Sequence, residues 1–217
     1  LNFADKLLSM DNTYWEKFYS KQNAELRPSL FAVYVNELFN NNKKKIIELG
    51  CGNGRDSIFF ANNSHNILAI DQCESEIKFL QNQYKQLNNI VFRCDDFTSL
   101  SLDNKYDIVY SRFTLHSIRK EEERRVLQWA YESLNEGGLF CIEVRGHKNE
   151  IYKLGEPVDN EPDAYIYNDH YRRFLNFETL CNDLKELGFT ITFAAEEKGF
   201  APFNGEDETY IRVIAKK

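Results

Sequence analysis

The chain has 217 residues, of which 42% are hydrophobic, and its formal net charge is −7. This length suits one ordinary domain with a full hydrophobic core and is short for two. The acidic balance argues against a general nucleic-acid-coating protein, whose surface would be basic. The five cysteines are widely spaced and include no CxxC pair, so they fit neither a disulfide framework nor a zinc site.

No apolar run in the sequence approaches the roughly 18 residues that a membrane helix needs. The first ten residues lack the basic start and the long apolar core of a signal peptide. The cysteine pattern is typical of a reducing compartment. We therefore expect a cytoplasmic protein that binds neither membrane nor nucleic acid, either as a monomer or as a homodimer.

Short apolar runs alternate with helical patterns from about residue 44 onward, which predicts an α/β fold with a mainly parallel sheet. The expected strands are 44–49, 65–70, 90–94, 106–110, 139–144, 189–195 and 208–215. The expected helices after the first strand are 55–62, 74–87, 120–134 and 177–187. No helix separates the last two strands, so they are expected to form an antiparallel hairpin at the sheet edge.

We predict a single domain over residues 1–217, built on a doubly wound, seven-stranded, mostly parallel sheet. Two segments depart from its regular alternation. Residues 1–43 contain two amphipathic helical segments, at about 12–20 and 29–39. Residues 146–175 contain two prolines, several acids and aromatics and no clean period. An irregular stretch of that length inside a compact domain is usually functional or disordered.

The strongest motif is IIELGCGNGRD at 46–56, in which a buried strand feeds a glycine-rich turn that opens a helix. Backbone N–H groups in such a turn can approach a ligand closely. A dinucleotide site prefers G-x-G-x-x-G, whose last small residue would fall on Arg55 here. Glu48 would also repel a pyrophosphate, whereas it can accept hydrogen bonds from an ammonium group. No Gly-Lys-Ser/Thr follows, which argues against Walker-type phosphate binding.

Asp71 ends the second expected strand, about 20 residues beyond the glycine turn. A carboxylate at that place can accept hydrogen bonds from the hydroxyls of a ribose. Taken alone, Asp71 would also fit a helix N-cap. Because Asp71 occurs together with the glycine turn, the ribose-binding interpretation is favoured over the N-cap.

Four stretches together resemble the class I S-adenosylmethionine (SAM)-dependent methyltransferases: ELGCGNGRD, the Ala-Ile-Asp that ends at Asp71, CDDF at 94–97 and YDIV at 106–109. The resemblance extends from about Trp15 to the C-terminus and implies a Rossmann-like fold. It also implies SAM as the cofactor and S-adenosylhomocysteine (SAH) as the product. In that family the glycine loop holds the methionine part of SAM, and acids after the second and third strands meet the ribose and the adenine.

Carried onto this sequence, the resemblance predicts contacts at the glycine loop, the ribose, the adenine and the methionine end. Asp95 and Asp96 are alternatives for the adenine amino group, and spacing alone does not choose between them. The predicted cofactor-binding residues are Glu48, Gly50, Cys51, Gly52, Asn53, Gly54, Asp71, Gln72, Asp95 or Asp96, Phe97, Ser111, Arg112 and Phe113.

A narrower resemblance involves YWEKFY at 14–19, RPSLF at 27–31 and HYRRF at 170–174. These motifs are similar to small bacterial methyltransferases encoded among capsule and lipopolysaccharide genes, which distantly resemble tellurite and thiopurine methyltransferases. In such proteins the N-terminal helices fold over the cofactor. The resemblance makes Tyr14, Trp15 and Tyr19 candidate lid residues, with core packing as the equal alternative.

Methyl transfer from a sulfonium is an in-line displacement, so positioning of the acceptor carries much of the work. A neutral hydroxyl acceptor also needs a base, for which His116 and His170 are the candidates. An anionic acceptor needs cations instead. The predicted acceptor-binding residues are Arg145, Tyr171, Arg172 and Arg173.

Two further charged stretches have simpler interpretations. Glu143 and Arg145 share a face of the fifth strand if it alternates there, so an internal salt bridge between them is as reasonable as substrate contact. The runs 43–45 and 121–125 are interpreted as solvated flanks with no role at the site.

We therefore expect a SAM-dependent methyltransferase of a small polar acceptor, without a metal. The leading hypothesis is O-methylation of an anionic or sugar intermediate in surface-polysaccharide biosynthesis, which rests on family analogy. N- or S-methylation of another metabolite and a non-catalytic SAM-binding role stay as alternatives. A nucleic-acid methyltransferase is disfavoured by the net charge and by SRFT at 111–114, where an Asn/Asp-Pro-Pro-Tyr/Phe motif would stand.

Overall fold

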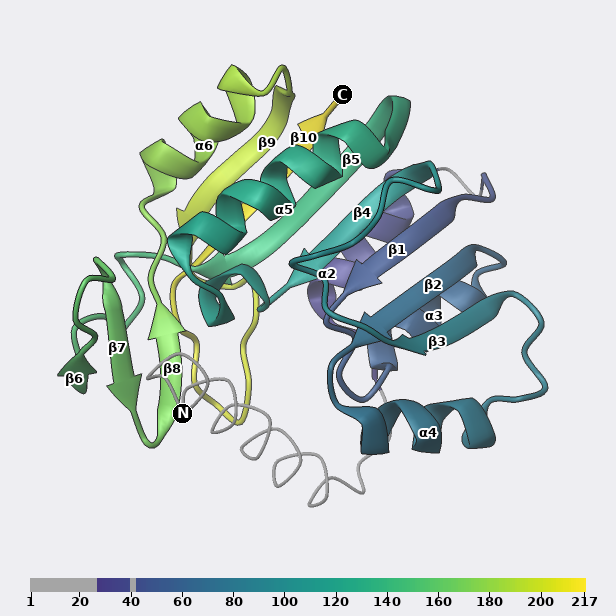
Figure 1. Cartoon of the computed structure of the whole chain (residues 1–217), viewed down its shortest axis with the longest axis horizontal. Helices are drawn as coiled ribbons and strands as arrows, with labels where there is room; N and C mark the ends of the chain where they lie inside the picture. Colours follow the sequence, from purple (N-terminus) through teal and green to yellow (C-terminus); the bar gives the residue numbers. More distant parts are fainter. Residues whose placement is uncertain (1–26, 40–41) are drawn as a thin grey trace.

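The computed structural model of the chain describes residues 27–39 and 42–217. Its main sheet has seven strands in the order β3-β2-β1-β4-β5-β10-β9 (Figure 1). Within these seven, β10 alone runs in the opposite direction to the other six strands, and it lies between β5 and the edge strand β9. The predicted mostly parallel sheet with a C-terminal antiparallel pair is confirmed. The strands are β1 (Lys45–Leu49), β2 (Asn66–Asp71), β3 (Ile90–Cys94), β4 (Tyr106–Arg112), β5 (Leu134–Arg145), β9 (Thr190–Glu197) and β10 (Tyr210–Lys216).

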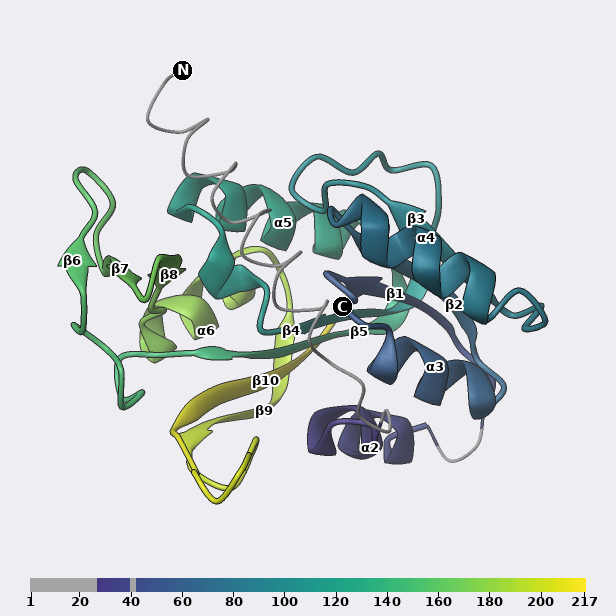
Figure 2. The ribbon, with the colours of Figure 1, turned by 90° about the horizontal axis from the view of Figure 1, so that it is seen from below.

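Helices cover both faces of the sheet, with α2 and α3 on one side and α5 on the other (Figure 2). The central strand β1 is apolar on both faces, as expected for a parallel strand buried between two helical layers. Its Ile46 packs in the cluster that contains residues of α2, α3 and α4, whereas Ile47 and Leu49 pack with α5 and α6. The helical elements are α2 (Leu30–Glu37), α3 (Arg55–Asn62), α4 (Glu74–Gln83), the 3₁₀ turn η1 (Leu115–Ser117), α5 (Lys120–Ser133) and α6 (Phe177–Glu186).

The segment 146–175 is more regular than expected. It forms a three-stranded antiparallel sheet, β6-β7-β8, with β6 at Glu156–Pro157, β7 at Ala164–Tyr167 and β8 at His170–Arg173. The prediction of an irregular insertion was therefore wrong in this part. The missed signal is the two-residue turn of Asn168 and Asp169, which both have positive φ (54° and 57°). Asn and Asp are among the residues that tolerate this conformation, and hairpin turns require it.

The N-terminal prediction falls only partly within the described residues. Helix α2 lies inside the expected range 29–39, and the Ser29 hydroxyl caps it by accepting a hydrogen bond from the backbone N–H of Ala32 at 3.0 Å. The expected helix at 12–20, with the candidate lid residues Tyr14, Trp15 and Tyr19, lies outside the described residues. Within residues 27–39 and 42–217, no helix is long and apolar enough to cross a membrane.

Candidate functional site

The glycine turn between β1 and α3 adopts a conformation that only its glycines allow without strain. Gly50, Gly52 and Gly54 have φ values of 70°, 50° and 74°, in the left-handed region that side chains disfavour. A Cβ atom on Gly50 would also stand 2.4 Å from Cγ2 of Thr114. Both the backbone conformation and the close packing therefore require glycine here.

Asp71 holds this loop against the end of β2. Its Oδ2 accepts a hydrogen bond from the backbone N–H of Gly52 at 2.8 Å, and its Oδ1 accepts one from Cys73 at 2.9 Å. Burial raises the pKa of the carboxyl, and these backbone N–H groups counteract that effect. Each carboxylate oxygen can accept more than one hydrogen bond, so Asp71 stays able to bind ribose hydroxyls. The N-cap of α4 is Cys73, so Asp71 supports the helix start without being its cap.

Glu48 lies in β1, two residues before the loop begins at Gly50, and is only 4% exposed. It accepts a hydrogen bond from the hydroxyl of Ser57 in α3. Burial, followed by the nearby charge of Asp56, raises the pKa of Glu48 well above its ordinary value. In the described structure Glu48 thus supports the start of α3, and its contact with a cofactor stays a prediction.

The two acids after β3 have different partners. Oδ2 of Asp95 forms an ion pair with Nη2 of Arg93 at 2.9 Å. Oδ1 of Asp96 accepts hydrogen bonds from both the backbone N–H and the hydroxyl of Thr98, each at 2.8 Å. Phe97 is buried beside them. Among the described residues, no hydrogen bond involves Oδ2 of Asp96, which makes it the better candidate for an adenine amino group.

At the carboxyl end of β4, a stack of two rings and one guanidinium is formed by Phe113, Tyr210 and Arg112. Phe113 has a φ of 60°, which is unusual for an aromatic residue, and its backbone N–H donates to the carbonyl of Glu143 at 2.8 Å. Its ring lies 4.8 Å from the ring of Tyr210, and the Arg112 guanidinium lies 4.0 Å from its centroid. Strained backbone of this kind persists where surrounding contacts over-determine it, often at functional sites.

Glu143 is fully buried and bridges two arginines. Its Oε1 accepts from Nε of Arg112 at 2.9 Å, and its Oε2 accepts from Nη2 of Arg212 at 2.5 Å. Of the two alternatives for Glu143 and Arg145, the salt bridge between them is not formed, because each has other partners. The reason is tertiary, because β10 places Arg212 directly opposite Glu143 across the antiparallel ladder.

Arg145 takes partners from two other segments. Its Nη1 donates to Oε2 of Glu208 at 2.6 Å and to Oδ1 of Asn149 at 2.7 Å. The same Glu208 oxygen accepts from the hydroxyl of Tyr210 at 2.5 Å, and the Arg145 guanidinium lies 5.1 Å from the Tyr210 ring centre. Glu208 and Tyr210 were not predicted as site residues, because they follow a loop with no recognised motif.

The HYRR motif on β8 divides between the two faces of the strand, since alternate side chains point to opposite sides. Arg173 is buried, pairs with the fully buried Glu123 of α5, and donates to the carbonyl oxygens of Leu115 and Ile118 at 3.3 and 3.1 Å. These partners argue against its predicted role as an acceptor ligand. The interpretation of 121–125 as a solvated flank is wrong at Glu123.

The other members of the motif differ from Arg173. Tyr171 is buried, and its hydroxyl has no hydrogen-bond partner among the described residues. Arg172 is half-buried, and its Nη1 donates to the carbonyl of Tyr167 in the same hairpin at 3.2 Å. His170 is almost fully buried. The predicted roles of these three residues stay predictions.

His116 lies in η1 and is 4% exposed. Its Nδ1 accepts a hydrogen bond from the backbone N–H of Arg145 at 3.3 Å, which assigns the ring proton to Nε2. Burial lowers the pKa of His116 well below its ordinary value, and the charges of Arg145 and Arg172 add to this effect. A neutral imidazole with its proton on Nε2 is a hydrogen-bond donor. This geometry argues against the predicted general-base role of His116.

Comparisons with known proteins agree with this architecture. Residues 46–138 match the family model described as a methyltransferase domain. A malonyl-[acyl-carrier protein] O-methyltransferase from Bacillus cereus is 25% identical over 132 residues, which is 60% of this chain and 48% of that protein. The chain thus spans about half the length of this relative.

Two solved structures show the same fold. A Burkholderia thailandensis 1,6-didemethyltoxoflavin-N1-methyltransferase, solved with SAH bound, has a TM-score of 0.74 at 16% identity and covers 100% of this chain and 91% of its own. TehB from Haemophilus influenzae has a TM-score of 0.68 at 18% identity, over 95% of this chain and 66% of its own. These likenesses confirm the Rossmann-like methyltransferase fold.

Proposed function

We propose, from the premise that residues 46–138 form a SAM-dependent methyltransferase domain, that the chain transfers the methyl group of SAM to a small polar acceptor. The observation that carries the proposal is the loop of three left-handed glycines, held by the Asp71 carboxylate through the Gly52 N–H. Such a loop after a central parallel strand, with an acid at the end of the next strand, suits the methionine and ribose parts of the cofactor.

SAM supplies a methyl group already activated by a sulfonium, so the chain's own residues act mainly by binding and orienting. In this proposal the backbone of 50–54 and the Asp71 carboxylate hold the cofactor, and Oδ2 of Asp96 accepts from the adenine amino group. The left-handed Phe113, held between Arg112 and Tyr210, forms a rigid border at the carboxyl ends of β4 and β5. Ligands of open α/β sheets bind at that edge. Rigid support of this kind is what an in-line displacement requires.

Of the two acceptor types expected from the sequence, an anionic oxygen of a phosphate or phosphoramidate or a neutral sugar hydroxyl, this proposal takes the anionic oxygen. Such an oxygen needs no base. The donor tautomer of His116 supports this choice, because its Nε2–H can bind an anionic oxygen. Arg145 and Arg173 contribute less than expected, since Glu208 and Glu123 neutralise them. Arg172, whose charge is close enough to lower the pKa of His116, is the arginine that we assign to the acceptor.

A place in capsule or surface-polysaccharide biosynthesis is part of the same proposal. It is supported by the similarity of the motifs at 14–19, 27–31 and 170–174 to small methyltransferases of such gene clusters. Methylation of nitrogen or sulfur in another metabolite is the alternative. Comparing SAH release with phosphorylated sugars, nucleotide-linked sugars and amine or thiol metabolites distinguishes them.

The first experiment is a thermal-shift series with SAM, SAH, NADH and ATP. A ligand present at 100 times its Kd stabilises the folded state by about 2.7 kcal/mol. At roughly 2–4 °C per kcal/mol for a domain of this size, we expect Tm to rise by several degrees with SAM and SAH. NADH and ATP serve as controls and should leave Tm unchanged. A rise with NADH and none with SAM would contradict the assignment of the loop.

A further inference from the structure

A buried polar cluster joins three segments of the chain just beyond the glycine loop. Its centre is the carboxylate of Asp56, the second residue of α3, which is 2% exposed. Oδ1 accepts from the backbone N–H of Ser29 at 2.7 Å. Oδ2 accepts from the Ser29 hydroxyl at 2.7 Å and from the Tyr110 hydroxyl at 2.9 Å. We call these three residues the Asp56 cluster.

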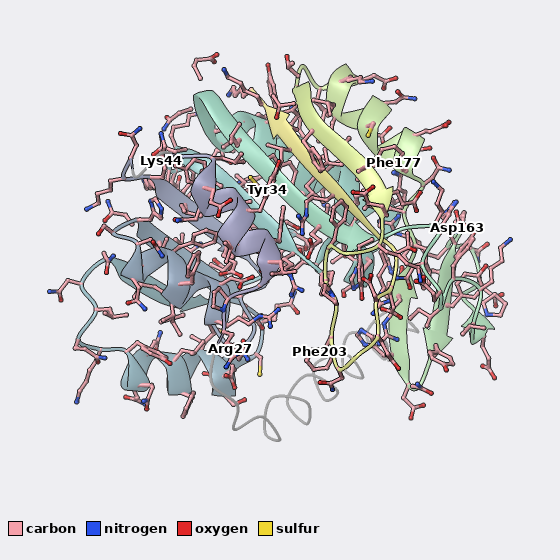
Figure 3. The ribbon with its side chains drawn as sticks, turned by 180° about the vertical axis from the view of Figure 1, so that it is seen from behind. Arg27, Tyr34, Lys44, Asp163, Phe177 and Phe203 are labelled. Carbon is pink, nitrogen blue, oxygen red and sulfur yellow. The ribbon has the colours of Figure 1, made fainter. Side chains whose placement is uncertain are left out.

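Each member of the Asp56 cluster belongs to a different element. Ser29 is the N-cap of α2, Asp56 lies in the first turn of α3, and Tyr110 lies in β4 next to β1. The cluster therefore connects the start of α2 with the helix that the glycine loop opens. The start of α2, marked by Arg27 in Figure 3, lies toward the same edge of the molecule as Phe203 in the β9–β10 connection.

The cluster completes the support of the glycine loop. At its entrance, the loop is held by hydrogen bonds from the backbone N–H groups of Cys51 to Ile70 (2.8 Å) and of Gly52 to Asp71 (2.8 Å). At its exit, the chain passes from Gly54 directly into the turn of α3 that carries Asp56. A displacement of Ser29 would remove two of the three hydrogen bonds that this buried carboxylate accepts, which is costly, so a shift of α2 is expected to shift α3.

We propose that Asp56 is a positioning residue for the cofactor, which couples the start of α2 to the glycine loop. The inference rests on the proposed function, because it assigns SAM to this loop. Coupling between two sites is reciprocal. Binding of SAM or SAH therefore favours the position of Ser29 in this structure, and loss of the Ser29 contacts lowers the affinity for the cofactor.

The test compares Ser29→Ala with a matched cap variant, Asn176→Ala. Asn176 is the N-cap of α6 and accepts from the backbone N–H of Thr179 at 2.9 Å, so its replacement removes a helix cap away from the loop. Isothermal titration with SAH gives Kd, and thermal unfolding gives Tm. We expect both variants to lower Tm. Only Ser29→Ala should weaken the binding of SAH, raising its Kd by about 10-fold. The Kd of Asn176→Ala for SAH should stay within about twofold of that of the unaltered chain.

Tyr110→Phe provides a second test of the coupling, because it removes one donor to Asp56. It leaves the cap residues Ser29 of α2 and Asn176 of α6 in place. It should also raise the Kd of SAH. In the double variant Ser29→Ala/Tyr110→Phe, the Kd for SAH should rise by less than the product of the two single fold-changes, since both substitutions act through the Asp56 carboxylate. A Kd unchanged in both single variants, with Tm lowered, would overturn the coupling. Absence of SAH binding to the unaltered chain would instead overturn the proposed function.

Discussion

Glu143 shows how single residues at the site take their roles from partners far away in the chain. Its carboxylate lies between Arg112 and Arg212, and the second of these is 69 residues away. Burial raises the pKa of Glu143, while both arginines favour its charged form. One buried acid thereby restrains Arg112 against Phe113, where the sequence alone indicated only a cofactor contact.

The Gly50 position provides a prediction at this scale. Gly50→Ala should lower Tm and weaken SAH binding by more than about 10-fold, because the new Cβ would meet Thr114 at 2.4 Å and so displace the loop. Gly199→Ala is the control, since Gly199 has a φ of 84° but no atom within 4 Å of an added Cβ. It should carry only the conformational cost, roughly 1 kcal/mol, with SAH affinity unchanged. If Gly50→Ala and Gly199→Ala had the same Kd for SAH, Gly50 would be needed only for the conformation of the turn and not for cofactor binding.

Among the elements, β8 separates two functions that look like one in the sequence. The alternation of the strand directs Arg173 to Glu123 and the carbonyls of η1, so this arginine fastens the small sheet to the main domain. Arg172, one position earlier, projects from the other face. Arg172 and Arg173, which the sequence suggested as one anion site, therefore have different roles: Arg173 is structural, and Arg172 is the candidate ligand.

This separation predicts opposite results for the two arginines. Arg173→Ala removes the partner of Oε2 of the buried Glu123, while Lys120 still pairs with Oε1. We therefore expect a loss of about 3 kcal/mol in the free energy of unfolding, the lower end for a broken buried ion pair. Arg172→Ala should lose much less stability and should raise the acceptor's KM far more than that of SAM. Chemical denaturation and steady-state kinetics measure the two effects. A stable Arg173→Ala chain, or equal KM changes for both substrates in Arg172→Ala, would refute the assignment.

At the scale of the whole molecule, burial of neutral His116 links stability to pH. Its pKa in the folded chain lies well below the ordinary value, whereas the unfolded chain restores it to about 6.5. The unfolded state therefore binds the proton more readily, and stability is lost as pH falls below about 6.5. Compared with His116→Asn, the unaltered chain should lose up to about 1.4 kcal/mol more per pH unit there.

Denaturant unfolding of both chains between about pH 7 and pH 5 measures this difference. Other titrating groups, including the buried His65, are common to both chains and cancel in the comparison. Parallel stability curves would show that the pKa of His116 is not lowered in the folded state. In that case the assignment of a neutral His116 with its proton on Nε2 would have to be given up.

The sequence alone was sufficient for the sheet, for the glycine loop and for the acid at the end of β2, because these depend on local periodicity and on short spacings. The residues that form each of these features lie close together in the chain, and a left-handed turn favours glycine over the other residue types. The pairings of Glu143 with Arg212, of Arg173 with Glu123 and of Asp56 with Ser29 required the folded chain. A buried charge takes whichever partner the packing of strands and helices brings within hydrogen-bond distance, and that neighbour is not encoded in local sequence order.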